Sequence, residues 1–299
     1  MVDSQAEVID MTREARLNVQ GLARQDKGLM SCMVPDPGYV FVSIDMTAGE
    51  PSVTTHLTRD KMYRYVCFDG IGKAPFYKNG VLMIDDIYLA YASVSPLFAE
   101  EVRKAFDEKY DGRTFSEQWL KDPEVIKNRL KKIRKKSKVY ALGFAYGLGS
   151  KKLVTQAFDQ GDILSQEQAA QAYKAYWQLF KGIREYQNIL SQAMTERGWL
   201  ENPFGFRFTC QPHVSFNYMI QSSVSSILNW FTSELMERAP YAQFVTIIHD
   251  ELIAQVPVDK TDEYFKAKEE VVRDINDQLK WTVDLRFGFA TGKNLFEAK

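Results

Sequence analysis

The chain has 299 residues, 45% of them hydrophobic, and its formal net charge is −1. This length and composition suit a folded protein with a sizeable core and exclude one that is basic over its whole surface, though not one with a local basic face. Cys32, Cys67 and Cys210 lack the spacing of a zinc site or a disulfide framework, which favours a reducing compartment. No apolar stretch is long enough to span a membrane, so we expect a cytoplasmic protein.

The first informative stretch is an apolar run that stops at an acid. Residues 1–38 are mixed and polar, and within them Asn18 and Gln20 could hydrogen-bond base edges or sugars. The run of residues 39–44 then predicts a strand that ends at Asp45, and a helix is expected to begin near Pro51. Glu50 lies at this corner. Two nearby carboxylates call for a metal or a hydroxyl donor, although a Glu in a first helical turn can also be an ordinary solvated residue.

Residues 58–114 are less informative. Turns are expected near residues 69–72 and 78–80, and a helix is expected to begin at Asp85. The region could be an insertion, and residues 61–120 could be either an enlargement of the domain they belong to or a docking surface.

A basic segment follows at residues 124–153, where the first half favours helix because it lacks Gly and Pro after Glu124. Arg134, Lys138, Leu142 and Tyr146 are spaced by four residues and therefore share one helix face. Two cations followed by an apolar surface and an aromatic ring suit a nucleoside triphosphate. A solvated lysine-rich face is the alternative. Gly147 is expected to end the helix.

Residues 165–197 predict an amphipathic helix, and residues 198–208 predict short strands around a Pro-Phe-Gly turn. The next helix carries Asn217 and Gln221 one turn apart. Their amides could bond minor-groove acceptors of DNA or satisfy neighbouring backbone groups.

The last informative stretch predicts a hairpin with His249, Asp250 and Glu251 at its tip, between two β-branched runs over residues 245–256. A carboxylate on a rigid strand end can hold a divalent metal, and Asp45 is the candidate second ligand. An Asp at a strand end can equally form a turn or cap a helix. A helix over residues 261–279 and a closing strand over residues 281–288 complete the chain.

Together these stretches resemble the polymerase portion of family A DNA polymerases, the DNA polymerase I-like group. Ser43-Ile-Asp45-Met-Thr-Ala-Gly-Glu50 looks like motif A, Arg134-x3-Lys138-x7-Tyr146-Gly147 looks like motif B, and His249-Asp250-Glu251 looks like motif C. The resemblance implies an α+β fold in which a largely helical fingers domain is inserted into an antiparallel palm sheet. It places the palm at residues 1–57 and 198–299 and the fingers at residues 58–197.

The resemblance also implies roles for the site residues in adding deoxynucleotides to a primer 3′-hydroxyl. The metal site would hold two Mg²⁺ ions and consist of Asp45, Asp250 and the carbonyl of Met46. The catalytic set would be Asp45, Asp250, Lys138 and Glu251. The nucleotide would contact Glu50, Arg134, Lys138, Leu142, Tyr146 and Met46. The primer-template would contact Asn18, Gln20, Gly147, Asn217, Gln221 and His249.

The sequence departs from the family at three site positions: Leu142 replaces an aromatic residue, Met46 a tyrosine and Ala48 a glutamine. These changes bear on sugar discrimination and on minor-groove checking. Because motif A lies close to the start of the sequence, we expect the family's thumb and 3′-5′ exonuclease domains to be missing from it. We therefore expect a phage-type split polymerase whose partner polypeptide supplies them, because backbone contacts provide much of the affinity for duplex DNA.

Three alternatives remain open at this point. A single-subunit RNA polymerase shares the Asp, Lys-Tyr-Gly and His-Asp elements, although Glu50 and Glu251 favour DNA synthesis. A non-catalytic DNA-binding subunit of a replication complex would not need both acids and both cations. A metal-dependent phosphohydrolase would explain the acids but not the stripe from Arg134 to Tyr146.

Overall fold

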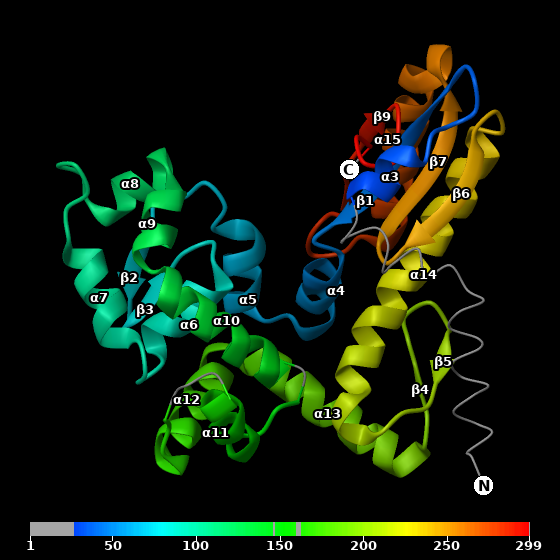
Figure 1. Ribbon diagram of the computed structural model, residues 1–299. Helices are drawn as coiled ribbons and strands as arrows, with labels where there is room; N and C mark the ends of the chain where they lie inside the picture. The colour runs from blue at the N-terminus through cyan, green and yellow to red at the C-terminus, as the bar shows by residue number, and fades with distance from the viewer. Residues whose placement is uncertain (1–26, 146, 160–162, 299) are drawn as a thin grey trace, which may run out of the picture. The chain divides into compact units, whose positions relative to one another are not determined.

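The computed structural model describes residues 27–145, 147–159 and 163–298 (Figure 1). Asn18, Gln20 and Tyr146 therefore lie outside the described residues. The chain divides into two compact units. We call Met1–Gly49 together with Val224–Lys299 the sheet unit, and Glu50–Ser223 the helical unit. The predicted α+β class, with a helical insertion in an antiparallel sheet, is confirmed. The palm and fingers boundaries at residues 57 and 197 remain predictions.

The sheet unit is built on five antiparallel strands in the order β6-β7-β1-β8, with β9 also pairing with β1. The strands are β1 (Tyr39–Thr47), β6 (Gln243–Ile248), β7 (Glu251–Pro257), β8 (Arg286–Phe287) and β9 (Ala290–Gly292). The helices are α3 (Lys27–Cys32), the C-terminal part of α14 (Ser215–Arg238), the 3₁₀ turn η3 (Val258–Lys260) and α15 (Thr261–Leu279). The chain passes from the sheet unit to the helical unit after Gly49, the first residue of α4 (Gly49–Thr58). It returns to the sheet unit at Val224, within α14.

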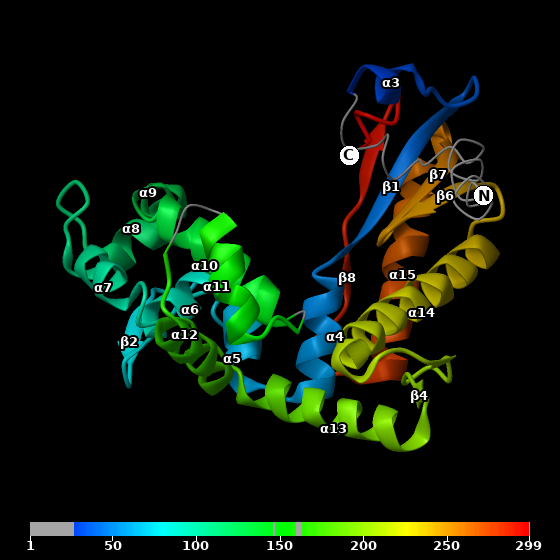
Figure 2. The same ribbon diagram turned by 60° about the horizontal axis from the view of Figure 1, so that its bottom comes forward.

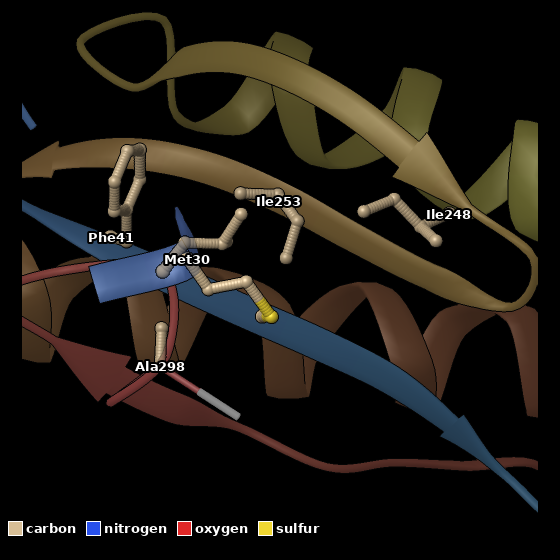
Figure 3. Close-up of a cluster of buried hydrophobic side chains, with 6 residues drawn as sticks. Met30, Phe41, Ile248, Ile253 and Ala298 are labelled. Atoms are coloured by element: carbon tan, nitrogen blue, oxygen red, sulfur yellow. The ribbon is translucent and has the colours of Figure 1, made fainter. Parts of the chain in front are cut away.

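Both faces of β1 are covered, because successive side chains of a strand point to opposite faces. On one face Phe41 and Ile253 form a buried cluster with Met30 of α3, Ile248 and Ala298 (Figure 3). α14 and α15 lie behind the strands in the same view. The buried side chains of Val42, Ile44 and Met46 belong to the other face of β1. β1 is therefore held rigidly by packing on both of its faces.

The helical unit contains two small hairpins and helices that range from the four residues of α5 (Lys61–Arg64) to the 17 residues of α13 (Lys181–Arg197) (Figure 2). Its first part comprises α5 (Lys61–Arg64), the π-helical turn η1 (Tyr65–Asp69), β2 (Phe76–Lys78), β3 (Val81–Met83), α6 (Ile87–Val94), α7 (Ala99–Asp107) and α8 (Phe115–Lys121). The second part comprises α9 (Pro123–Arg129), α10 (Lys131–Ala145), α11 (Ser150–Asp159), α12 (Gln166–Leu179), α13 (Lys181–Arg197), β4 (Leu200–Glu201), β5 (Arg207–Phe208) and the 3₁₀ turn η2 (Pro212–Val214).

Buried aromatic rings join α6, α10 and α12 and so fix the basic helix α10. Tyr91 of α6 packs edge-on against Phe144 of α10, with ring centroids 6.2 Å apart. Tyr176 of α12 contacts both rings at 5.5 Å. Edge-to-face pairs of this kind add about 0.5–1.5 kcal/mol each beyond the burial of their area. Because these rings occupy one side of α10, its charged stripe faces elsewhere.

Three predicted elements differ from the structure. The basic helix is interrupted at Leu130, where φ −99° and ψ 15° separate α9 from α10. The helix expected over residues 165–197 breaks at Phe180, and the closing strand consists of β8 and β9 instead of one run over residues 281–288. The turn at residues 78–80 is confirmed, since Asn79 and Gly80 both have the positive φ of a two-residue hairpin loop.

No helix among the described residues combines the length and the apolarity that a membrane crossing requires.

Candidate active site

In the sheet unit, strand pairing brings the predicted acids together. β1 and β7 are antiparallel neighbours, and Asp45 lies directly opposite Glu251. The backbone N–H of Met46 donates to the carbonyl of Asp250 at 3.0 Å, which ties the two strand ends one residue further along. Asp45 and Asp250 therefore occupy neighbouring positions at the same end of two paired strands, although 205 positions separate them in the sequence.

Asp45 is exposed, and the residues on either side of it in β1 are buried. Ile44 and Met46 anchor the strand in the core, so the carboxylate projects from a fixed backbone. Directly after β8, which pairs with the end of β1, the N–H of Gly288 donates to the Asp45 carbonyl at 2.7 Å. A ligand held this way loses little conformational entropy when it binds a metal.

Glu251 is held by a hydroxyl. Ser43 Oγ donates to Glu251 Oε1 at 2.5 Å across the β1–β7 pair. Ser43 is buried and lies two residues before Asp45, so both side chains emerge on one face of the sheet. Asp45 and Glu251 are like charges directly opposite one another, an arrangement that costs a fraction of a kcal/mol, and the hydroxyl donor offsets part of the repulsion.

The hairpin tip holds His249 in a left-handed conformation, with φ 60°. β6 ends at Ile248 and β7 begins at Glu251, so His249 and Asp250 form a two-residue loop. A positive φ at the first loop position matches the primed hairpin turns, in which Gly is usual. The backbone strain is local to the residue that precedes the metal-ligand candidate Asp250.

The oxygen donors of this site suit Mg²⁺. Within residues 27–145, 147–159 and 163–298, no group of three or more His, Cys, Asp or Glu side chains is placed to hold a metal ion. The predicted donors are the carboxylates of Asp45 and Asp250 and the adjacent carbonyl of Met46 on the rigid end of β1. Mg²⁺ typically takes one or two protein carboxylates and completes its shell with water and substrate phosphates, so this donor set fits it.

In the helical unit, the cations of the predicted stripe lie on α10. Arg134 Nε donates to Asp86 Oδ2 at 2.6 Å, and the Asp86 side chain is only 4% exposed. The other oxygen of Asp86 accepts from the N–H groups of Tyr88 and Leu89 and so caps α6. Lys138 is exposed one turn after Arg134. The two cations thus begin a charged face whose first member is fixed by a buried carboxylate.

The helical unit contains a cavity of about 270 Å³ beside this stripe. Four predicted site residues line it: Glu50, Leu142, Asn217 and Gln221. Leu142 stands one turn beyond Lys138 and is 36% exposed, as an apolar wall requires. Leu142 of the stripe and the two amides, which the sequence could place only on separate helices, therefore line one cavity.

Other cavity residues were not predicted from the sequence: Tyr63, Cys67, Tyr88 and Tyr176. They come from α5, η1, α6 and α12, and no local pattern signals that they converge. Burial raises the pKa of the Cys67 thiol to about 12, even though a hydrogen bond with Tyr63 acts in the opposite direction. Burial likewise raises the pKa of the Tyr63 and Tyr176 hydroxyls. These three groups are therefore uncharged at neutral pH.

Gly147 follows α10 in a left-handed conformation with φ 88°. A side chain there would start 3.2 Å from the His213 carbonyl, which is tighter than ordinary contact. The glycine that was predicted to end the helix therefore also allows a close approach of two backbones. Its predicted contact with the primer-template remains a prediction.

The sequence pattern of DNA polymerase family A matches residues 98–297. This range includes α10 and the His249-Asp250-Glu251 hairpin but not Asp45. Among curated proteins, the chain is 25% identical over 260 residues to a DNA polymerase of Mycobacterium phage D29, which covers 84% of this chain and 35% of the phage protein. It is 24% identical over 151 residues to DNA polymerase I of Aquifex aeolicus, covering 48% and 26% of the two chains.

Among solved structures, the chain is similar to the POL domain of Pol1 from M. smegmatis, in a complex with DNA primer-template and dNTP. The TM-score is 0.66 and the identity 17%, and the match covers 94% of this chain and 45% of the other. At this identity the likeness shows the fold. This chain spans about a third of the length of the phage polymerase and about a quarter of the Aquifex one. The family pattern covers about two thirds of the chain, and on that ground the chain belongs to DNA polymerase family A.

Proposed function

We propose that this chain is the catalytic part of a DNA-templated DNA polymerase that adds deoxynucleotides to a primer 3′-hydroxyl with two Mg²⁺ ions. The observation that carries the proposal is the pairing of β1 with β7, which sets Asp45 against the Asp250–Glu251 strand end. Asp45, Asp250 and the Met46 carbonyl would hold the metal. When bound, Mg²⁺ lowers the pKa of the attacking hydroxyl and stabilises the leaving pyrophosphate.

The chain's own groups account for the remaining tasks. Arg134 and Lys138 supply positive charge for the triphosphate, a use in which preorganised cations are most effective. Leu142 offers an apolar wall to the base or sugar, and Glu50 at the rim of the same cavity would exclude a ribose 2′-hydroxyl. Glu251, held by Ser43, supports the metal site from beside it, and His249 would contact the primer end.

The two amides of α14 would read the primer-template. Asn217 and Gln221 are one helical turn apart and line the cavity that Leu142 also lines. Gly147 would allow the template to approach the end of α10. Amide side chains can bond the acceptors that every base pair presents in the minor groove, so these contacts would be independent of sequence.

Primer extension with purified protein tests the proposal. The expected result is Mg²⁺-dependent extension with deoxynucleotides that falls about 10³-fold in the Asp45→Asn and Asp250→Asn variants. Asp274→Asn is the matched control, because Asp274 is an acid of the same unit that pairs with Arg238. Extension that survives in Asp250→Asn would overturn the assignment, since no metal-ligand role would then remain for that acid.

Two alternatives are separated by the same assay. A single-subunit RNA polymerase would prefer ribonucleotides, whereas the exposed Glu50 at the cavity favours deoxynucleotides. A non-catalytic DNA-binding subunit would bind primer-template without extending it under any metal condition. Competition between the two nucleotide types, followed on a single primer, distinguishes all three.

Phage DNA replication is the proposed setting, supported by the similarity to a mycobacteriophage polymerase. A partner polypeptide that carries a thumb and a 3′-5′ exonuclease is proposed from the resemblance alone. Co-purification from infected cells, followed by extension assays with and without the bound chain, tests it. Long products from this chain by itself would contradict the need for a partner.

A further inference from the structure

One aromatic ring contacts both cations of the stripe. The Arg134 guanidinium carbon lies 5.3 Å from the centroid of the Tyr88 ring, and Lys138 Nζ lies 5.7 Å from it. Both distances fall within the range of about 6 Å in which a cation is attracted to a ring face. Tyr88 lies on α6 and the cations on α10, and these two helices pack against each other.

The same buried carboxylate holds the backbone of Tyr88 and the guanidinium of Arg134. Asp86 Oδ1 accepts from the backbone N–H of Tyr88 at 3.0 Å, and Asp86 Oδ2 accepts from Arg134. Tyr88 stands in the first turn of a capped helix, so its Cα position is well determined. The backbone that carries the ring is therefore fixed, and the flexible Lys138 side chain rests on the ring beside the guanidinium of Arg134.

The ring also belongs to the wall of the cavity. Tyr88 lines the 270 Å³ space together with Leu142, which offers no aromatic surface of its own. The cations, the ring and the cavity thus form one continuous region of the helical unit. A ligand with a polyanionic end and an apolar end would match this region.

Arg134 is held by Asp86, whereas Lys138, one turn away, is repelled by Arg134 and has many rotamers. A free lysine side chain loses conformational entropy when it is ordered. A ring that attracts both cations offsets this cost before the ligand arrives, and it leaves their outer N–H groups to the phosphates. Preorganisation of this kind strengthens binding without adding a contact to the ligand.

From this geometry we infer that Tyr88 is a positioning residue for the triphosphate: its ring holds Arg134 and Lys138 ready to receive the phosphates. The inference rests on the proposed function and deepens it. Tyr88 acts through the face of its ring, so the hydroxyl is dispensable. A phenylalanine at position 88 should therefore preserve triphosphate binding, and a leucine should weaken it.

The test compares the Tyr88→Leu and Tyr88→Phe variants. Tyr88→Leu is expected to raise the KM for dNTP by about 5- to 30-fold with less than about a threefold change in kcat. Tyr88→Phe should stay within about twofold of the wild type. Tyr77→Leu is the matched control, because Tyr77 carries a similar contact with Arg103 at 4.5 Å but does not line the cavity. Circular dichroism confirms that each variant is folded.

Direct binding separates this inference from the proposed function. Tyr88→Leu should weaken binding of dATP and of inorganic tripolyphosphate by similar factors and leave binding of deoxyadenosine unchanged. Equal weakening of dATP and deoxyadenosine would overturn the inference, because the ring would then contact the base. An unchanged tripolyphosphate affinity would overturn it as well. If tripolyphosphate binding responds as expected but no primer is extended, the polymerase proposal fails and the role of Tyr88 stands.

Discussion

His249 occupies a conformation that a glycine would adopt at no cost. Its φ of 60° places the Cβ close to the following carbonyl, which costs about 1–2 kcal/mol in a non-glycine residue. We therefore expect His249→Gly to be about 1 kcal/mol more stable than His249→Ala in urea unfolding at pH 7. Neither variant has an imidazole, so the difference between their free energies of unfolding reports the backbone strain alone. Equal stabilities would show that the loop relaxes in the alanine variant.

Cys67 should be slow to react with alkylating reagents. Burial raises the pKa of its thiol from 9.0 to about 12, so only about one part in 10⁴ is thiolate at pH 8. With iodoacetamide at pH 8, Cys32, which is exposed, should be labelled long before Cys67. Peptide mass spectrometry measures both rates in one sample, with Cys67→Ser as the control for peptide assignment.

The same shift gives a pH dependence of stability. The folded state binds the Cys67 proton more tightly than the unfolded state does. The contribution is therefore complete below about pH 9 and is lost as the pH rises from 9 toward 12. Cys67→Ser should lose less stability than the wild type over this interval. If the wild type and Cys67→Ser lost the same stability between pH 9 and 12, the thiol would not contribute to the pH dependence.

Single residues show where prediction from the sequence ends. The Asp45–Asp250 pair follows from two strand ends and one resemblance, and the register confirms the strand pairing. The Ser43–Glu251 hydrogen bond does not follow, because it depends on that register. Tyr63 and Tyr176 reach the cavity from helices more than a hundred residues apart, and no periodicity indicates such a convergence.

At the scale of elements, Asp86 both caps α6 and pairs with α10. An asparagine keeps the cap but loses the charge, whereas an alanine loses both. We expect Asp86→Ala to be about 1 kcal/mol less stable than Asp86→Asn, which is the usual value of an N-cap. Chemical denaturation of both variants measures the difference. The order should persist with Arg134→Gln as background, because neither variant forms the ion pair. Equal stabilities of Asp86→Ala and Asp86→Asn would show that the cap contributes nothing.

Element types were easier to predict than element ends. The hairpin, α14 and α15 follow from clear periodicity, and α15 spans Thr261–Leu279 as predicted. Leu130 breaks a helix in a stretch without Gly or Pro, and Phe180 lies two residues before the single glycine of residues 165–197, Gly182, so propensity gives no signal for the first break and a weak one for the second. The bends satisfy tertiary packing instead: Phe180 is fully buried and packs on Tyr176 at 5.1 Å.

For the whole molecule, the near-zero net charge conceals an uneven distribution. Lys and Arg outnumber Asp and Glu in the helical unit, and the reverse holds in the sheet unit. The excess gathers on α10, where Lys132 and Lys135 are exposed in addition to the cations of the stripe. Binding of DNA releases about one counterion for each phosphate that a cation neutralises. The helical unit should therefore dominate the salt dependence of binding.

A charge-neutralising pair tests this expectation. Lys132→Ala/Lys135→Ala should weaken binding to primer-template and make the slope of log K against log salt less steep by about 1 to 2. Lys266 and Lys293 are exposed cations of the sheet unit, and their double alanine variant should leave the slope unchanged. Fluorescence anisotropy at several salt concentrations gives both slopes. If the sheet-unit pair changed the slope as much as the α10 pair, DNA would be held by charges of both units, and the local basic face would not be its main binding surface.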